Sequence, residues 1–188
     1  QNSYGGVLAG IGASVDILNN DFSVGSYAIY TTGSGTYAAI HGNEINGGSY
    51  AIRLTSGDAD VTGNIFTGQT SSSIQVFTSS TPAISGNIFV SSSYNYGAIH
   101  TFSSSSPTIR SNTFTDAAPC VLLWDNSTAD IGTSVDPGLN NFSAANGSAV
   151  YSSSTGDATA HGNTWSNDPP QCGVDIITAS SGSVYFGT

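Results

Sequence analysis

The chain has 188 residues, 38% of them apolar, which is enough to bury a substantial core. Only 7% are charged, and two Arg against twelve acidic residues give a net charge of −10. Nucleic-acid binding and docking on anionic membranes need clusters of basic residues, so this composition excludes both. No apolar run is long enough to span a bilayer, so membrane insertion is not expected either. The Lys-free, Ser- and Thr-rich, acidic composition favours an extracellular or cell-surface location.

A repeat of about 23 residues runs along the chain. Its first phrase, apolar–x–x–Asn–x–(Phe, Ile or Trp), appears as ILNNDF, IHGNEI, VTGNIF, ISGNIF, IRSNTF and AHGNTW, with a degraded copy in ADIGTSVDPGLNNF. The Asn positions are Asn20, Asn43, Asn64, Asn87, Asn112, Asn140 and Asn163. A second phrase follows each copy and carries an apolar anchor. The anchors are Ile29, Ile52, Ile74, Ile99, Val121, Val150 and Val174.

These phrases predict short strands bounded by Gly, Ser and Asn, with no helix between them. Short strands repeated at this period are typical of a parallel β-helix. We therefore predict an all-β fold in which residues 1–188 form a single parallel β-helix domain of about eight coils. Each Asn is expected at a tight bend, in the left-handed conformation, with its amide bonded to the Asn of the next coil in a structural ladder. The aromatic residue two positions later is expected to fill the interior.

The phrase I-x-G-N-x-F followed by A-I resembles the repeats of right-handed parallel β-helix proteins of the pectin-lyase-like superfamily. The resemblance covers nearly the whole chain and implies a right-handed solenoid. That superfamily includes polysaccharide lyases, glycoside hydrolases, phage tailspikes and non-catalytic surface proteins, so the resemblance is specific for fold and poor for function.

Candidate catalytic residues are sparse. The resemblance implies that a lyase needs a basic residue beside calcium-binding carboxylates, but Arg53 and Arg110 fall on different strands, and no Asp occupies the places near Arg53. A hydrolase needs a carboxylate pair. Asp16, Asp60 and Asp130 share a phase but stand two and three coils apart. The three His residues fall on different strands or distant coils. We therefore predict a non-catalytic member, with no catalytic residue, no metal ligand and no cofactor.

Phe77, Phe102 and Trp124 fall three residues past the anchor on three successive coils. They form either a stacking surface for sugar rings or a partner, or an aromatic stack packed at a corner of the solenoid. Three Asn residues match the glycosylation acceptor pattern and are candidate modification sites: Asn126, Asn141 and Asn146.

Cys120 and Cys172, the two cysteines, fall near the same phase but two coils apart. This separation is long for a disulfide, and buried free thiols are the alternative.

No end cap is evident in the sequence. Val7 matches the phase of Ile29, and Val184 matches that of Val61, so the last strand leads in phase to the first. Head-to-tail stacking would then build a filament. The residues expected to make the contact are Val7, Leu8, Val184, Tyr185 and Phe186. The sequence thus predicts a secreted or cell-surface structural or adhesive solenoid that self-associates through its ends. The alternative is a carbohydrate-active or glycan-binding β-helix with a polysaccharide ligand.

Overall fold

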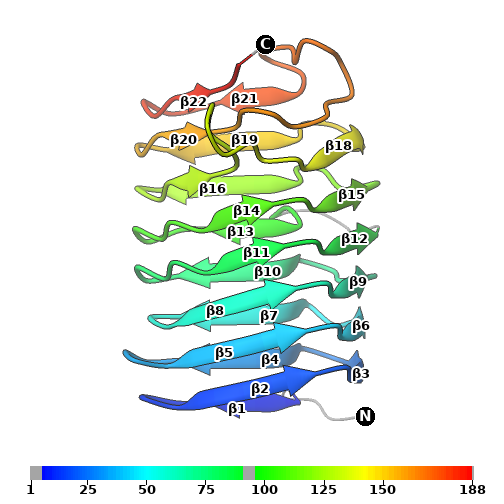
Figure 1. The fold of residues 1–188 in the computed structure, drawn as a ribbon, viewed down its shortest axis with the longest axis vertical. Coiled ribbons are helices and arrows are strands. Elements are labelled where there is room, and N and C mark those ends of the chain that lie inside the picture. The colour runs from blue at the N-terminus through cyan, green and yellow to red at the C-terminus, as the bar shows by residue number, and fades with distance from the viewer. Residues whose placement is uncertain (1–5, 91–95, 188) are drawn as a thin grey trace.

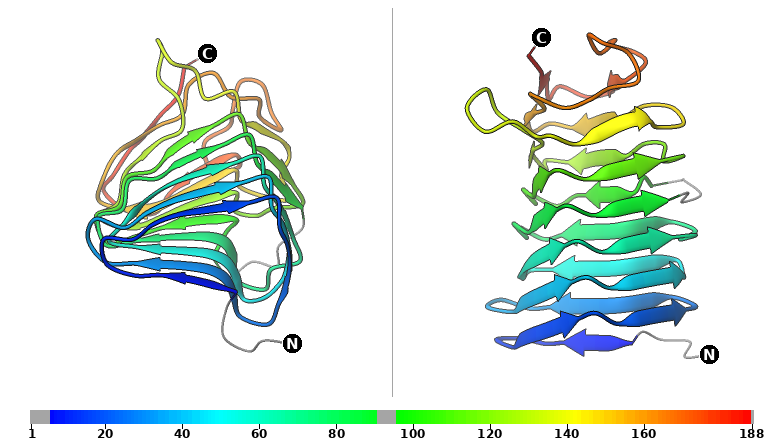
Figure 2. Two further views of the ribbon diagram at one scale, coloured as in Figure 1. Left: turned by 60° about the horizontal axis from the view of Figure 1, so that its bottom comes forward. Right: turned by 45° about the vertical axis from the view of Figure 1, so that its right-hand side comes forward.

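The computed structural model describes residues 6–90 and 96–187, and its 22 strands stack into one solenoid. Three parallel sheets run along the solenoid: each of the first six coils adds one strand to every sheet, and the last two coils add strands to two of the sheets (Figure 1). β1 and β22 lie at opposite ends of the stack. The coils stack one above another along a single axis, and the loops around residues 131–140 and 166–175 project near the C-terminal end (Figure 2). The predicted fold class is confirmed.

We call the three sheets A, B and C. Sheet A contains, in spatial order, β1 (Val7–Ala9), β4 (Tyr27–Thr32), β7 (Tyr50–Thr55), β10 (Ser72–Phe77), β13 (Ile99–Thr101), β16 (Val121–Asp125), β19 (Val150–Ser154) and β21 (Ile176–Thr178). Sheet B contains β2 (Ser14–Leu18), β5 (Tyr37–His41), β8 (Asp58–Thr62), β11 (Ala83–Ser85), β14 (Thr108–Arg110), β17 (Ala129–Asp130), β20 (Ala158–Thr159) and β22 (Val184–Tyr185). Sheet C contains β3 (Asp21–Val24), β6 (Glu44–Gly47), β9 (Ile65–Thr67), β12 (Ile88–Val90), β15 (Thr113–Thr115) and β18 (Asn141–Ala144).

The core follows from the alternation of side chains along each strand, because every second residue points inward. In sheet A the anchors pair in register, so that Ile52 lies between Ile29 and Ile74, and all three are fully buried. In sheet C the interior holds an aromatic stack whose neighbouring ring centroids are 4.7 to 5.2 Å apart. Its members are Phe66, Phe89, Phe114, Phe142 and Trp165.

The repeated Asn residues form a continuous hydrogen-bonded column at the bend before sheet C. Each of the first six donates both its backbone N–H and its side-chain amide to the side-chain oxygen of the next, with side-chain distances of 2.9 to 3.0 Å. The amide of Asn87 also donates to the carbonyl of Val61 at 2.8 Å. Asn87 is fully buried, so its amide cannot hydrogen-bond to water, and the column supplies its hydrogen-bond partners instead.

The left-handed conformation lies one residue earlier than predicted. The residue before each column Asn has a positive φ of 53 to 67°, whereas the column Asn residues themselves do not. These bend residues are Asn19, Gly42, Gly63, Gly86, Ser111, Leu139 and Gly162. The Gly-Asn pair therefore divides two tasks: Gly takes the bend without a Cβ penalty, and Asn satisfies the buried backbone groups.

Two register predictions at the C-terminal end are wrong by two residues. Ile176, not Val174, pairs with Val150 and is buried, while Val174 is 50% exposed. Val184 pairs with Ala158, which places it in the phase of Ala59 rather than Val61. In the first case the cause is a turn over residues 166–175 that lengthens the coil.

That turn is held by the buried carboxylate of Asp175. It accepts hydrogen bonds from the hydroxyl of Ser166, from the amide of Asn167 at 3.0 Å and from the backbone N–H of Gln171 at 2.8 Å. Burial alone would raise the pKa of Asp175, but these hydrogen bonds outweigh it and hold the pKa below its usual value. An Asp therefore occupies an almost fully buried place, which the apolar repeat does not predict.

Candidate functional site on the outer face of sheet A

A row of outward-facing side chains follows the anchors of sheet A. In each strand the residue after the anchor points away from the core, and the parallel pairing aligns these residues from coil to coil. Arg53 pairs with Gln75, and Gln75 pairs with His100. We call Arg53, Gln75 and His100 the polar row.

Aromatic side chains enclose the polar row at its N-terminal end. The rings of Tyr27 and Tyr50 stack with centroids 5.2 Å apart. The guanidinium carbon of Arg53 lies 4.3 Å from the ring centroid of Phe77 and 5.6 Å from that of Tyr30. Arg53 also donates from Nη1 to the hydroxyl of Tyr27 at 3.1 Å. The positive charge therefore meets aromatic faces, and no carboxylate in the described residues pairs with it.

Gln75 and His100 are buried and Arg53 is half-buried, yet several polar atoms of the row lack hydrogen-bond partners within the described residues. Gln75 is 5% exposed and His100 is 7% exposed. Arg53 Nε, Gln75 Oε1 and both ring nitrogens of His100 have no hydrogen-bond partner within the described residues, nor does the hydroxyl of Thr55 on the neighbouring outward position. Buried polar atoms without partners cost free energy, so this concentration on one face calls for an explanation.

His100 lies at the C-terminal end of the row, between two aromatic rings. Its ring is parallel to that of Tyr96, with centroids 5.5 Å apart, and the centroid of Phe102 is 4.4 Å away. Burial lowers the pKa of His100 to about 4. The imidazole is therefore neutral at pH 7 and offers one donor and one acceptor.

A surface hollow of about 270 Å³ opens beside this histidine. It is lined by Tyr96, His100, Phe102, Trp124 and Asp125. Trp124 is 47% exposed and Tyr96 is 44% exposed, so two aromatic faces are open to a ligand. Aromatic walls with a few polar groups at the edge are the usual lining of a small-molecule site.

The comparison with protein-family models bears on the whole solenoid. Residues 5–186 match the model described as a right-handed β-helix region. The chain belongs to this family. The match confirms the resemblance and the right-handed fold inferred from the repeats. A search of curated proteins found no match, and a search of solved structures found none.

In this β-helix, Phe77, Phe102 and Trp124 lie on successive coils, as the register of their strands requires. Phe77 and Phe102 are half-buried, and their rings are in contact. The aromatic surface is therefore one continuous feature that joins Arg53 at one end to the hollow at the other.

Sequence analysis did not predict that Gln75, His100 and Tyr96 belong to the candidate site. The available signal was a run of polar outward residues on three adjacent coils, directly beside the aromatic positions. A second signal was that Arg53, in the position beside Gln75, has no Asp in the places near it.

The carboxylates of sheet B do not gather into a site. Asp16, Asp60 and Asp130 share a phase, as predicted from the sequence. The hydroxyl of Tyr37 donates to Asp60 at 2.7 Å, and Asp130 forms an ion pair with Arg110 at 2.7 Å. No group of three or more potential metal ligands occurs in the ranges that the structure describes.

Arg110 has a structural role that the sequence did not reveal. Its guanidinium also contacts Asp136 at 2.9 Å, which ties the projecting loop to sheet B. Partial burial would raise the pKa of Asp130, but hydrogen bonds from Arg110 and Gly132 outweigh it and leave the pKa below its usual value. The carboxylates of Asp130 and Asp136 therefore both pair with the guanidinium of Arg110.

The three candidate glycosylation sites lie on the surface. Asn126 is exposed, but its amide donates to the hydroxyl of Ser104 at 2.7 Å, and its oxygen accepts from the N–H of Ser104. Asn141 is exposed and accepts from the hydroxyl of Ser143 at 2.7 Å, and Asn146 is exposed in a loop.

The two cysteines differ in environment. Both are free thiols: Cys120 is fully buried and Cys172 is exposed. The expectation of a buried thiol is wrong for Cys172, because the turn that contains it projects from the last coil. Burial raises the pKa of the Cys120 thiol, so this thiol is unreactive near neutral pH.

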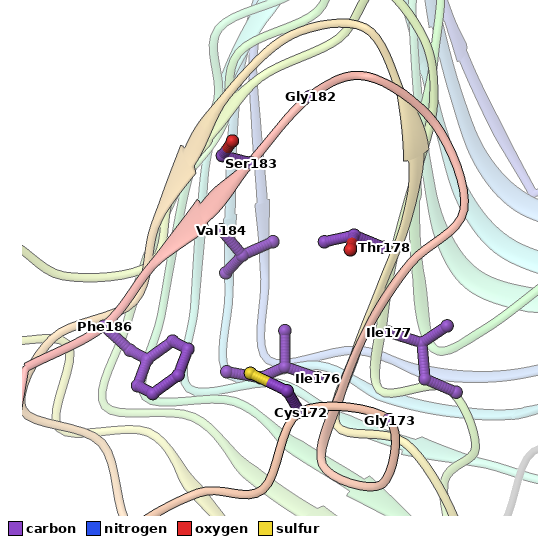
Figure 3. A pocket seen from close by; sticks show the side chains of 9 residues that line it. All are labelled: Cys172, Gly173, Ile176, Ile177, Thr178, Gly182, Ser183, Val184 and Phe186. Atoms are coloured by element: carbon purple, nitrogen blue, oxygen red, sulfur yellow. The ribbon is translucent and has the colours of Figure 1, made fainter.

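The predicted end-contact residues occupy the first and last coils. Leu8 is 71% exposed and Tyr185 is 52% exposed, while Val7 and Phe186 pack against the core. In the last coil a hollow lies between β21 and β22, with Ile176, Val184 and Phe186 around it (Figure 3). No helix in the described ranges is long and apolar enough to cross a membrane.

Proposed function

We propose that this β-helix is an extracellular or cell-surface adhesive protein that binds polysaccharide on the outer face of sheet A. The observation that carries the proposal is the polar row: Gln75 and His100 are buried beside surface aromatic rings, and Gln75 Oε1 and both ring nitrogens of His100 have no partner within the described residues. A sugar offers hydroxyl groups to such atoms and apolar ring faces to aromatic side chains.

The secreted location draws support from composition. The chain has no Lys, a net charge of −10 and many Ser and Thr residues on its strands. In a parallel solenoid each outward residue stacks on its counterpart about 4.8 Å away, where like charges repel. Uncharged hydroxyl residues avoid that repulsion and keep the surface hydrated.

Affinity electrophoresis through gels that contain different polysaccharides tests the proposal. The chain is expected to be retarded by at least one polysaccharide, and Trp124→Ala is expected to reduce the retardation. Tyr37→Ala is the matched control, because it removes an exposed aromatic ring from sheet B. Equal mobility of the chain in every polysaccharide gel and in the plain gel would contradict the proposal. Release of reducing sugar in the same incubations would instead favour the carbohydrate-active alternative.

Self-association is a second candidate function. Within the described residues, the outer edges of β1 and β21 have no strand partner, and Leu8 in β1 is largely exposed. Unpaired strand edges are a template for pairing with another chain, and head-to-tail contacts extend into filaments. Sedimentation over a range of concentrations tests this, with Leu8→Lys expected to reduce association. A monodisperse monomer at high concentration would contradict it.

A further inference from the structure

We infer that the ligand is an uncharged polysaccharide whose only polar groups are hydroxyls and ether oxygens, and that one of its sugar rings occupies the hollow beside His100 and Trp124. This inference rests on the proposed function and narrows it to a substrate class. Three independent properties of the face support it: the hydrogen-bond donors and acceptors that it presents, its charge, and the direction of the polar row along the solenoid.

The unpartnered atoms call for both donors and acceptors in the ligand. Gln75 Oε1 is an acceptor and needs a donor, whereas Arg53 Nε is a donor and needs an acceptor. The neutral imidazole of His100 needs one of each. A hydroxyl group both donates and accepts, so a polyol can satisfy all three side chains. An ionised carboxylate or sulfate only accepts and an ammonium only donates, so the sugar hydroxyls, and not such charged groups, match the whole row.

The charges around the face disfavour a polyanion. The chain carries a net charge of −10, and the carboxylate of Asp125 lines the hollow itself. Of the two basic residues, Arg110 is paired with Asp130 and Asp136 on sheet B. The other, Arg53, lies outside the hollow, and its charge already meets the ring faces of Tyr27, Tyr30 and Phe77. An acidic polysaccharide would meet repulsion at the hollow, whose lining includes Asp125 and no Lys or Arg.

The direction of the row fits an extended polymer. The three polar side chains lie on adjacent coils, so they are spaced along the solenoid axis by the strand separation of about 4.8 Å. A chain of sugar rings laid along this axis presents hydroxyls to successive coils. A sugar ring in the hollow lies against the exposed faces of Trp124 and Tyr96, at the edge where His100 lines the same hollow.

Binding of defined polysaccharides tests the inference. The neutral probes are soluble starch and galactomannan, the acidic probes are polygalacturonate and alginate, and chitosan is the cationic probe. We expect one neutral polysaccharide to bind, with little dependence on salt, because no ion pair contributes. His100→Phe keeps an aromatic ring but removes both nitrogens, and it is expected to weaken this binding about tenfold. Trp124→Ala, at an exposed position, is expected to weaken it at least as much.

The matched control is His41→Phe, which removes an imidazole from sheet B and should leave binding unchanged. The outcomes separate the two proposals. Preference for an acidic polysaccharide, or for chitosan at high salt, would overturn this inference while leaving polysaccharide binding intact. Unchanged affinity of a correctly folded His100→Phe variant would also overturn it. Failure of every probe to bind would contradict the proposed function itself.

Discussion

The imidazole of His100 lies parallel to the phenol ring of Tyr96, with the two centroids 5.5 Å apart and the planes inclined by only 6°. This contact buries a titratable group that has no hydrogen-bond partner in the described residues. A buried histidine of this kind affects both the stability of the fold and the recognition of a ligand.

The stability of the protein should therefore depend on pH through His100. Its pKa is about 4 in the folded protein and about 6.5 in the unfolded chain, so between these values only the unfolded chain takes up the proton. The stabilising contribution is fully present well above pH 6.5 and is lost as the pH falls, by about 1.5 kcal/mol between pH 6.5 and pH 5. Urea unfolding across this range measures the loss.

The variant His100→Phe isolates this effect. It should remove most of the pH dependence between pH 6.5 and pH 5, whereas His41→Phe should retain it. The lowered pKa values of Asp130 and Asp175 act at lower pH and do not interfere. An unchanged pH profile in His100→Phe would show that His100 is not the group responsible.

Asn87 should contribute more to stability than Asn20, although both belong to the same column. The side chain of Asn87 accepts from the backbone and side chain of Asn64 and donates to Asn112 and to the carbonyl of Val61. Asn87→Ala leaves several buried groups without partners and should cost about 3 kcal/mol or more. Asn20 is exposed, so water replaces its partners and Asn20→Ala should cost about 1 kcal/mol. Equal losses in chemical denaturation would be inconsistent with a buried column.

The bend before the column should tolerate only small changes in backbone conformation. Gly63 has a φ of +65°, and a Cβ added there meets no atom within 4 Å, so Gly63→Ala tests backbone strain without a clash. We expect a loss of about 1 kcal/mol. Gly10→Ala is the control, because Gly10 has equal space and no positive φ. Thermal unfolding of the pair should rank Gly63→Ala as the less stable, and the reverse order would argue against the assigned bend.

The two thiols should react at very different rates. Alkylation of the native protein is expected to modify Cys172 rapidly and to leave Cys120 untouched until the protein unfolds, because the thiol of Cys120 is buried and its pKa is raised. Mass spectrometry after brief treatment should find one modified site. Rapid modification of Cys120 would mean that the coil around it opens readily.

Much of the fold was predictable because the repeat encodes it locally. Each Asn, each anchor and each aromatic residue recurs at the coil length, so position in the repeat determines depth in the core. The prediction was wrong where a single coil departs from the period. Val174 occupies the place expected for an anchor, but the turn held by Asp175 shifts the buried position to Ile176.

The candidate site was predictable only in part. The aromatic positions Phe77, Phe102 and Trp124 were evident from their spacing, but the burial of His100 depends on Tyr96, which belongs to a loop without the repeat pattern. Likewise, the pairing of Arg110 with Asp136 depends on an insertion that no other coil contains. Contacts made by irregular loops are set by tertiary packing, which a repeat cannot specify.

The most direct test of polysaccharide binding on sheet A is the solvent accessibility of Trp124. The chain has two Trp residues, and Trp165 is buried in the aromatic stack, so a Trp165→Phe variant leaves the fluorescence of Trp124 alone. The account predicts that a neutral polysaccharide shifts this emission and reduces its quenching by acrylamide. A polysaccharide that binds the protein without changing the emission or the quenching of Trp124 would contradict it.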